Sequence, residues 1–203
     1  YGFAEFLRKL YVLLKIILKI PFYFFSIFIF IFIRVLNRIV TIRIGNIISQ
    51  RLGHFISEPE LYLCELDQEQ KNNPNKKYFD IFFYDGSISN SKVDNMIKEH
   101  LIVAPNFVLE PLYKILKFLA ENLRKENIFN PFSHLIKRPI SADRDVKNFF
   151  QNNNQRIKLS QSDLDKGYKI LKEMGVKNNN YVCLAVRDEN YLNKMEPRGD
   201  WSY

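Results

Sequence analysis

An arginine and an aspartate, Arg187-Asp188, directly follow a short apolar stretch near the end of the sequence. This stretch, Tyr181–Val186, is rich in β-branched and aromatic residues and has the length of a buried strand. In open α/β sheets, ligands bind beyond the carboxyl ends of the strands. A fixed cation and a carboxylate therefore stand where such a domain does its chemistry. A local salt bridge without a function is the alternative.

More charged and aromatic residues follow within reach of this pair. They are Tyr191, Arg198, Asp200, Trp201 and Tyr203. The aromatic side chains could stack on a sugar or a base, and packing against another domain is an equally good explanation. Because the sequence ends here and begins with Tyr1, we expect it to be a fragment of a longer protein.

A second candidate site surrounds Gly53-His54, which we expect in a turn from a loop into a helix. Glycine permits a close approach of the backbone, and the start of a helix offers free N–H groups to an anion. His54 is the only one of the three histidines next to a glycine turn. We expect His100 and His134 to be surface residues.

The elements that would position these residues alternate between strand and helix. The expected strands are Thr41–Ile48, Lys77–Asp85, Leu101–Ala104 and Tyr181–Val186. The expected helical segments are one that begins at the Gly53-His54 turn, then Ser91–His100, Leu109–Leu123 and the stretch from Ser160 to Met174. This alternation predicts an α/β fold with a Rossmann-like parallel sheet and flanking helices over residues 41–155. Residues 156–203 would complete the sheet or begin a second domain.

The first 40 residues are apolar and basic, which predicts a membrane-associated helix. The residues expected to contact the membrane surface are Arg8, Lys15, Lys19, Arg34 and Arg38. Polar residues recur every three or four positions from Arg8 to Ser26, so one face of the helix is polar and the other apolar. Positive charges flank both ends of the apolar run, which favours a helix in the membrane plane over a spanning one. A buried helical hairpin of a soluble core is the alternative, and Pro21 predicts a kink or a new helix.

The charge distribution argues against a nucleic-acid-binding protein. Residues 1–60 hold eight Lys or Arg against three acids, within a formal net charge of +8. The basic residues are thus interleaved with Phe and Ile, and they do not form a solvated basic face. Cys64 and Cys183 lie in apolar runs without CxxC spacing, so we expect two buried, reduced thiols. We predict no metal site.

Two motifs together resemble a family of bacterial glycosyltransferases that is found with genes for surface polysaccharide. Arg51–Glu65, RLGHFISEPELYLCE, is similar to an R-[IL]-G-H-[LF] signature that ends in ELYLCE. Tyr181–Tyr203, YVCLAVRDENYL…RGDWSY, is similar to a VCLHVRDxxYL…RDWSYH signature. Asp85–Pro105 also follows the family pattern, and the resemblance covers residues 42–203. It implies a two-domain, GT-B-like fold whose N-terminal half would lie in this chain.

The resemblance also implies roles for single residues. The VRD block is similar to an element of fucosyltransferases whose arginine binds the phosphates of the donor, so Arg187 would hold a nucleotide-sugar diphosphate. The other expected cleft-lining residues are Gly53, Glu58, Tyr191, Arg198 and Trp201. His54, Asp188 or Glu58 could take the proton of the acceptor hydroxyl, and we favour His54 and Asp188 as catalytic. Ala185 departs from the family, which usually has His at this position.

The sequence therefore leads to two hypotheses of different classes. The first is a membrane-associated glycosyltransferase at the cytoplasmic face of the bacterial inner membrane. It would move a sugar from a nucleotide donor to a lipid-linked or surface-glycan acceptor, with no cofactor and no nucleic-acid partner. The second is a non-catalytic membrane-associated scaffold or regulator of envelope glycan assembly.

Overall fold

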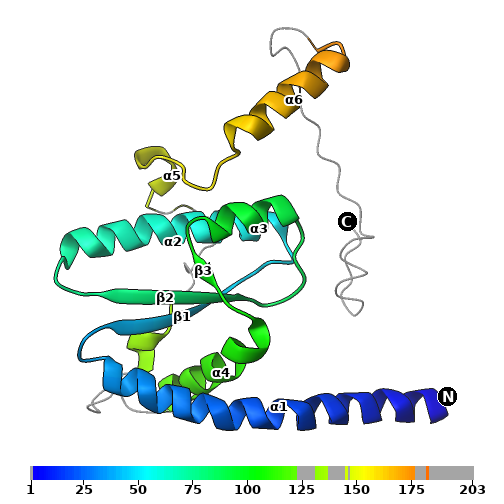
Figure 1. Cartoon of the computed structure of the whole chain (residues 1–203), viewed down its shortest axis with the longest axis vertical. Helices are drawn as coiled ribbons and strands as arrows, with labels where there is room; N and C mark the ends of the chain where they lie inside the picture. Colours follow the sequence, from blue (N-terminus) through cyan, green and yellow to red (C-terminus); the bar gives the residue numbers. More distant parts are fainter. Residues whose placement is uncertain (1, 123–130, 137–144, 146, 177–181, 183–203) are drawn as a thin grey trace. The chain divides into compact units, whose positions relative to one another are not determined.

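The computed structural model describes residues 2–122, 131–136, 145, 147–176 and 182 (Figure 1). The chain divides into two compact units, Tyr1–Lys158 and Leu159–Tyr203. The described helix of the second unit is α6 (Gln161–Glu173), where the Oγ of the N-cap residue Ser160 accepts a hydrogen bond from the N–H of Asp163. The sheet and the sites discussed below all belong to the first unit.

A parallel sheet with the strand order β1-β2-β3 forms the centre of the first unit. The strands are β1 (Thr41–Ile47), β2 (Tyr78–Tyr84) and β3 (Ile102–Val103). The register of the first two pairs Thr41 with Tyr78 and Ile47 with Tyr84, so their carboxyl ends meet at one edge. On the other side of β1, Leu135 forms a parallel bridge with Ile44, and the N–H of Ile136 donates to the Ile44 carbonyl at 2.9 Å.

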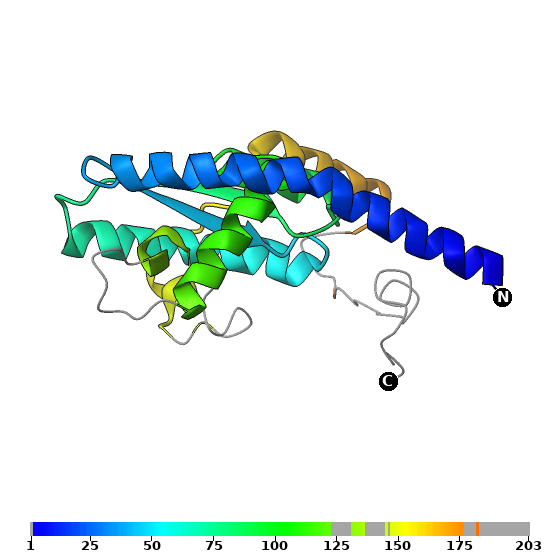
Figure 2. The ribbon, with the colours of Figure 1, turned by 90° about the horizontal axis from the view of Figure 1, so that it is seen from below.

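Helices cover both faces of this sheet (Figures 1 and 2). The helices of the unit are α1 (Gly2–Leu36), α2 (Leu52–Asn72), α3 (Ser91–Lys98), α4 (Asn106–Asn122), the 3-10 helix η1 (Pro131–His134) and α5 (Phe149–Asn152). One core cluster joins α2 and α3 to Phe82 of β2, and the other joins α1 and α4 to Phe83. Neighbouring strand residues point to opposite faces, so Phe82 and Phe83 serve different cores. The α/β sheet with flanking helices that the sequence predicts is confirmed.

The observed elements differ from the predicted ones mainly where proline occurs. Helix α2 begins at Leu52, as the predicted turn into a helix at Gly53-His54 indicates, and it continues through Pro59. Helix α1 likewise continues through Pro21 as one helix, so the prediction of a new helix there is wrong. Burial on the sheet stabilises α2 around its proline, since Phe55, Tyr62 and Leu63 on both sides of Pro59 lie in the core.

Helix α1 has 35 residues and is therefore about 52 Å long. Its C-terminal half packs on α4, where the rings of Phe22 and Phe107 meet edge to face with centroids 5.5 Å apart. Ser26 and Ile33 are buried on this side, and the Ser26 hydroxyl donates to the Phe22 carbonyl at 2.7 Å. The N-terminal half continues past α4 (Figures 1 and 2). The alternative of a buried helical hairpin is thus wrong.

The opposite side of α1 presents large apolar side chains to the exterior. In the C-terminal half they are Phe24, Phe25, Ile27, Phe28, Ile31, Phe32 and Val35. On the side toward the protein, Ser26 is buried and Tyr23 is half-buried, and the apolar Ile29, Phe30 and Ile33 pack in the core. No helix within the described residues combines the length and the apolarity that crossing a bilayer requires.

Replacing Gly45 with alanine is expected to lower the free energy of unfolding by about 1–3 kcal/mol, because β1 and β2 pack closely there. A Cβ atom at position 45 would lie 2.6 Å from Cε1 of the buried Phe82 ring and 3.1 Å from Cβ of Ile136. Urea denaturation measures the effect. In the same assay, Gly45→Ala with Phe82→Leu should cost less than the sum of the two single changes.

Gly53→Ala is the matched control for this prediction. No heavy atom lies within 4 Å of a Cβ built at Gly53, and the position is in the first turn of a helix. Alanine there should leave stability unchanged or raise it by up to about 1 kcal/mol. Equal costs for both substitutions would contradict the steric explanation.

Candidate functional site

The loops at the carboxyl edge of the sheet are held together by hydrogen bonds around Ser49. Its N–H donates to Oδ1 of Asp85 at 3.3 Å, and its Oγ donates to the Gly86 carbonyl at 3.0 Å. The Ser49 carbonyl accepts the N–H of Ser89 at 2.9 Å. Because Ser49 precedes α2 and the other three residues connect β2 to α3, these bonds fix the start of α2 against the end of β2.

The start of α2 differs from the starts of the helices with capped N-termini. At α3, the side chain of Asn90 accepts hydrogen bonds from the N–H groups of Lys92 and Val93 at 2.9 and 3.1 Å. At α2, the N-cap residue Arg51 supplies no such cap, and the first turn holds no acidic residue. Gly53, with no atom near its Cβ position, keeps this turn open. The N–H groups of the first turn can therefore serve an anion at the sheet edge.

His54 and Glu58 form a pair on the first two turns of α2. Nδ1 of His54 lies 3.1 Å from Oε1 of Glu58, and a carboxylate can only accept the proton between them. In a neutral imidazole, this bond places the proton on Nδ1 and leaves Nε2 with a lone pair, as in a base held by an orienting carboxylate. Glu58 is buried, whereas the His54 side chain is 31% exposed. The imidazole can thus meet a reactant while its partner stays fixed.

The end of β2 is fixed from two further sides. The hydroxyl of Tyr84 donates to Oδ1 of Asp94 on α3 at 2.6 Å, and the Asn106 side chain donates to the Tyr84 carbonyl at 3.0 Å. Burial and the Asp94 carboxylate raise the pKa of the Tyr84 phenol. Tyr84 therefore stays protonated and has a structural role at this edge.

The candidate carboxyl-edge site lies where the chain changes direction along the sheet. From β1, helix α2 leads to β2, whereas the chain after β3 passes through α4 to Leu135 on the other side of β1. Ligands of open α/β sheets bind in the crevice beyond such a reversal of strand order. Among the predicted site residues, the structure brings Gly53, His54 and Glu58 to this place on α2.

The remaining predicted site residues are distributed as follows. Arg187, Asp188, Tyr191, Arg198 and Trp201 lie outside the described residues. Arg8 is on α1 and forms an exposed ion pair with Glu5, with Nη2 and Oε1 2.6 Å apart. Arg34 is near the end of α1, and Arg38 is in the turn that follows it. Lys15 and Lys19 lie within α1, and their side chains are outside the described part.

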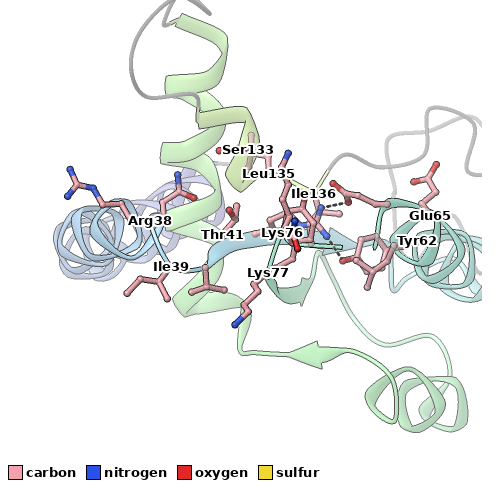
Figure 3. A pocket seen from close by; sticks show the side chains of 17 residues that line it. Arg38, Ile39, Thr41, Tyr62, Glu65, Lys76, Lys77, Ser133, Leu135 and Ile136 are labelled. Atoms are coloured by element: carbon pink, nitrogen blue, oxygen red, sulfur yellow. Dashed lines mark hydrogen bonds and ion pairs between the residues drawn. The ribbon is translucent and has the colours of Figure 1, made fainter. Parts of the chain in front are cut away.

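Sequence reasoning missed an ionic network at the amino edge of the sheet, around Arg43 of β1 (Figure 3). Nε and Nη2 of Arg43 bind the two carboxylate oxygens of Asp80 at 2.6 and 2.9 Å, and Nη1 binds Glu69 at 2.7 Å. The Tyr62 hydroxyl donates to Asp80, and the guanidinium lies 3.8 Å from the centre of the Tyr78 ring. The only sequence signal was a charged residue on each of two neighbouring strands.

The network holds its members in one protonation state. Burial and the negative charge of Asp80 raise the pKa of Tyr62. Burial alone would raise the pKa of Glu69, but hydrogen bonds from Arg43 and Tyr78 bring it below its ordinary value. For Arg43, the hydrogen bonds to Asp80 and Glu69 outweigh burial and raise the pKa. Arg43 is therefore a permanent structural cation.

His134 corrects the prediction that it is a surface residue. It is fully buried at the end of η1, and its Nδ1 donates to the Ile42 carbonyl at 2.7 Å. Burial lowers the pKa of the imidazole below its ordinary value, although the hydrogen bond acts in the other direction. This hydrogen bond attaches the segment before Leu135 to the edge of β1 that β2 does not occupy. His100 is exposed, as predicted.

Cysteines and carboxylates give no further site in the described part of the chain. Cys64 is buried and free, as predicted, and burial raises the pKa of its thiol; Cys183 lies outside the described residues. No group of three or more His, Cys, Asp or Glu in the described residues could hold a metal ion. On α6, Asp163 accepts from Ser160 and Asp165 accepts from Gln161, as helix-start residues do.

Comparisons with protein-family models, with curated proteins and with solved structures found no match. The family resemblance of the two sequence motifs therefore stays a prediction.

Proposed function

We propose that the protein is a membrane-associated glycosyltransferase that moves a sugar from a nucleotide-sugar donor to a lipid-linked or surface-glycan acceptor. The observation that carries this proposal is the His54–Glu58 pair, with Nδ1 and Oε1 3.1 Å apart, at the carboxyl edge of the sheet. A partly exposed histidine that is oriented through Nδ1 suits the removal of a proton from an acceptor hydroxyl. Glu58 acts through His54 as a positioning residue.

The donor side of the proposal rests on charge. A nucleotide-sugar donor leaves as a diphosphate, whose negative charge must be stabilised as the bond to the sugar breaks. The uncapped start of α2 offers backbone N–H groups beside His54. Arg187 would add a planar guanidinium that pairs with two phosphate oxygens, as the family resemblance implies. Asp188 is the second candidate for the base.

The fold supports the proposal at a coarser level. The order β3-β2-β1, with Leu135 on the far side of β1, is the order in which a doubly wound nucleotide-binding sheet begins. In the proposed GT-B-like fold, this sheet is one of two Rossmann-like domains, and the cleft between the domains holds donor and acceptor.

The membrane part of the proposal rests on the outward face of α1. Exposed Phe and Ile side chains follow one another along this helix, and Arg34 and Arg38 stand near its C-terminal end. Large contiguous apolar surfaces of this kind mark membrane or protein interfaces. A helix in the plane of the cytoplasmic face of the bacterial inner membrane would bury these side chains and leave the arginines among the headgroups.

Nucleotide-sugar binding tests the proposal. In a thermal-shift screen of the intact protein with UDP-, GDP- and CMP-sugars, one nucleotide class is expected to raise the melting temperature. Arg187→Ala should abolish the shift, and Arg8→Ala, which removes an exposed arginine of α1, should keep it. A folded protein that no nucleotide sugar stabilises would instead favour the non-catalytic scaffold.

A further inference from the structure

A pocket of about 540 Å³ opens at the amino edge of the sheet, opposite the candidate carboxyl-edge site (Figure 3). Thr41 and Tyr78, the first residues of β1 and β2, lie at its base. Its walls come from the turn after α1, from Tyr62 and Glu65 of α2, from the loop before β2 and from residues 133–136. Its volume is in the range of small-molecule sites.

The charges inside this pocket leave a small negative excess. Asp80 and Glu69 bind Arg43 at distances between 2.6 and 2.9 Å, so the charge of its guanidinium is already neutralised. Glu65, the other acidic lining residue, is paired with Lys147 at 3.3 Å. The interior thus contributes one negative charge, from two carboxylates and one guanidinium, and an anion can be attracted only if the rim cations outweigh it.

Three cations from two separate turns surround the rim. Arg38 belongs to the turn between α1 and β1, and Lys76 and Lys77 belong to the loop between α2 and β2. All three are exposed. The charge of Lys76 acts on Glu69 and helps to lower the pKa of that carboxyl, whereas no carboxylate among the described residues lies within ion-pair distance of any of the three. Figure 3 shows Arg38 and Lys77 on different sides of the rim. Their long, flexible side chains can turn onto an anion, and Asn37, Asn75 and Ser133 add polar groups to the lining.

The position of the rim beside α1 indicates where the anion comes from. Ile39 follows Arg38 in the same turn and is 75% exposed, and Val35 one turn earlier is exposed too. An apolar side chain between basic ones is typical of a segment at the boundary between headgroups and acyl chains. If α1 lies on a membrane, the mouth of the pocket lies at the level of the headgroups.

We infer that this pocket binds the phosphate of an anionic phospholipid headgroup, with Arg38, Lys76 and Lys77 supplying the positive charge. The inference rests on the membrane association proposed above and is independent of sugar transfer. A glycerophosphate headgroup suits the pocket because its volume exceeds what a phosphate ion alone would fill. The site gives the anchor a preference for anionic lipid that the apolar face of α1 cannot supply.

The test compares vesicle binding of the whole chain and of two double variants. Lys76→Gln with Lys77→Gln removes two rim charges. The control variant, Lys92→Gln with Lys158→Gln, removes two exposed charges on the α2 and α3 side of the sheet, the face opposite α1. Binding is measured by co-sedimentation with phosphatidylcholine vesicles, with and without phosphatidylglycerol.

On vesicles that contain phosphatidylglycerol, the rim variant should bind about 25-fold more weakly than the wild type, at about fivefold per charge. The control variant should bind like the wild type, because its charges lie on the face of the sheet that α1 does not cover. On pure phosphatidylcholine, all three proteins should bind equally. Equal binding of all three to the anionic vesicles would overturn the site.

Inorganic phosphate distinguishes a lipid source from a soluble one. If phosphate raises the melting temperature of the wild type but not of the rim variant, and the vesicle affinities are equal, the pocket takes a soluble anion and the lipid assignment is wrong. If the wild type binds no vesicle at all, both the membrane association and this lipid site are wrong. Stabilisation of the same sample by a nucleotide sugar tests the transferase proposal separately.

Discussion

Replacing Arg43 with methionine is expected to lower the free energy of unfolding by about 3–5 kcal/mol, because Asp80 would keep a buried charge without its partner. The side chains of Arg43 and Asp80 are each only 11% exposed, and two hydrogen bonds of 2.6 and 2.9 Å join them. Methionine keeps the apolar stem of the side chain and removes only the guanidinium. Urea denaturation followed by circular dichroism measures the effect.

Two further variants separate the buried charge from the loss of packing. In Arg43→Met with Asp80→Leu, both charges are gone, and at least half of the lost stability should return, since an apolar pair can replace a buried ion pair. Lys114→Met removes an ion pair with Glu110 of the same 2.6 Å length in which the lysine is 52% exposed. It should cost less than about 1 kcal/mol. If the double variant is less stable than Arg43→Met, the explanation by an unpaired charge is wrong.

Replacing His54 with alanine is expected to lower the rate of sugar transfer by about 10²–10⁴-fold in the intact protein, the usual contribution of a general base. Stability should fall as well, because the buried Glu58 loses its hydrogen bond with His54, so the rate is compared at a temperature at which both proteins are folded. The rate is measured at saturating donor with a short-chain lipid-linked acceptor. Donor affinity should stay the same, because the proton is taken from the acceptor.

Glu58→Gln and His100→Ala complete the test of His54. Glutamine at position 58 can accept from Nδ1 but carries no charge, so it should slow transfer less than the loss of His54 does. His100 is exposed, and its ring bonds only the Arg156 carbonyl at 3.1 Å among the described contacts. His100→Ala should therefore transfer at the wild-type rate. Equal rates in all three variants would remove His54 from the mechanism.

The sequence predicted the sheet because its signals there are local. Apolar runs such as Tyr78–Tyr84 and the Asn90 cap act within a few residues, and the structure has a strand and a helix start at these places. The extent of the helix that contains Pro59 was harder to predict, since proline interrupts the helical pattern while tertiary packing keeps α2 continuous. The burial of His134 could not be foreseen either, because it depends on the free edge of a strand more than 90 residues earlier.

The candidate site was predictable in part for the same reason. His54 and Glu58 are four residues apart, so a helix beginning before them brings their side chains together. The Arg43 network joins two strands and a helix, with partners 26 and 37 residues away. Nothing in the local spacing indicates such a network. The network forms because the register of β1 and β2 places Arg43 beside Asp80.

Helix α1 runs back along the sheet from the start of β1, and this direction has a consequence for how the protein would find its acceptor. Leu36 stands at the amino edge and Phe22 contacts Phe107 near the carboxyl edge, a span of 14 residues or about 21 Å. A membrane-bound α1 would hold both edges at one height above the lipid. The protein would then search for a lipid-linked acceptor in two dimensions, at an effective concentration far above that in solution.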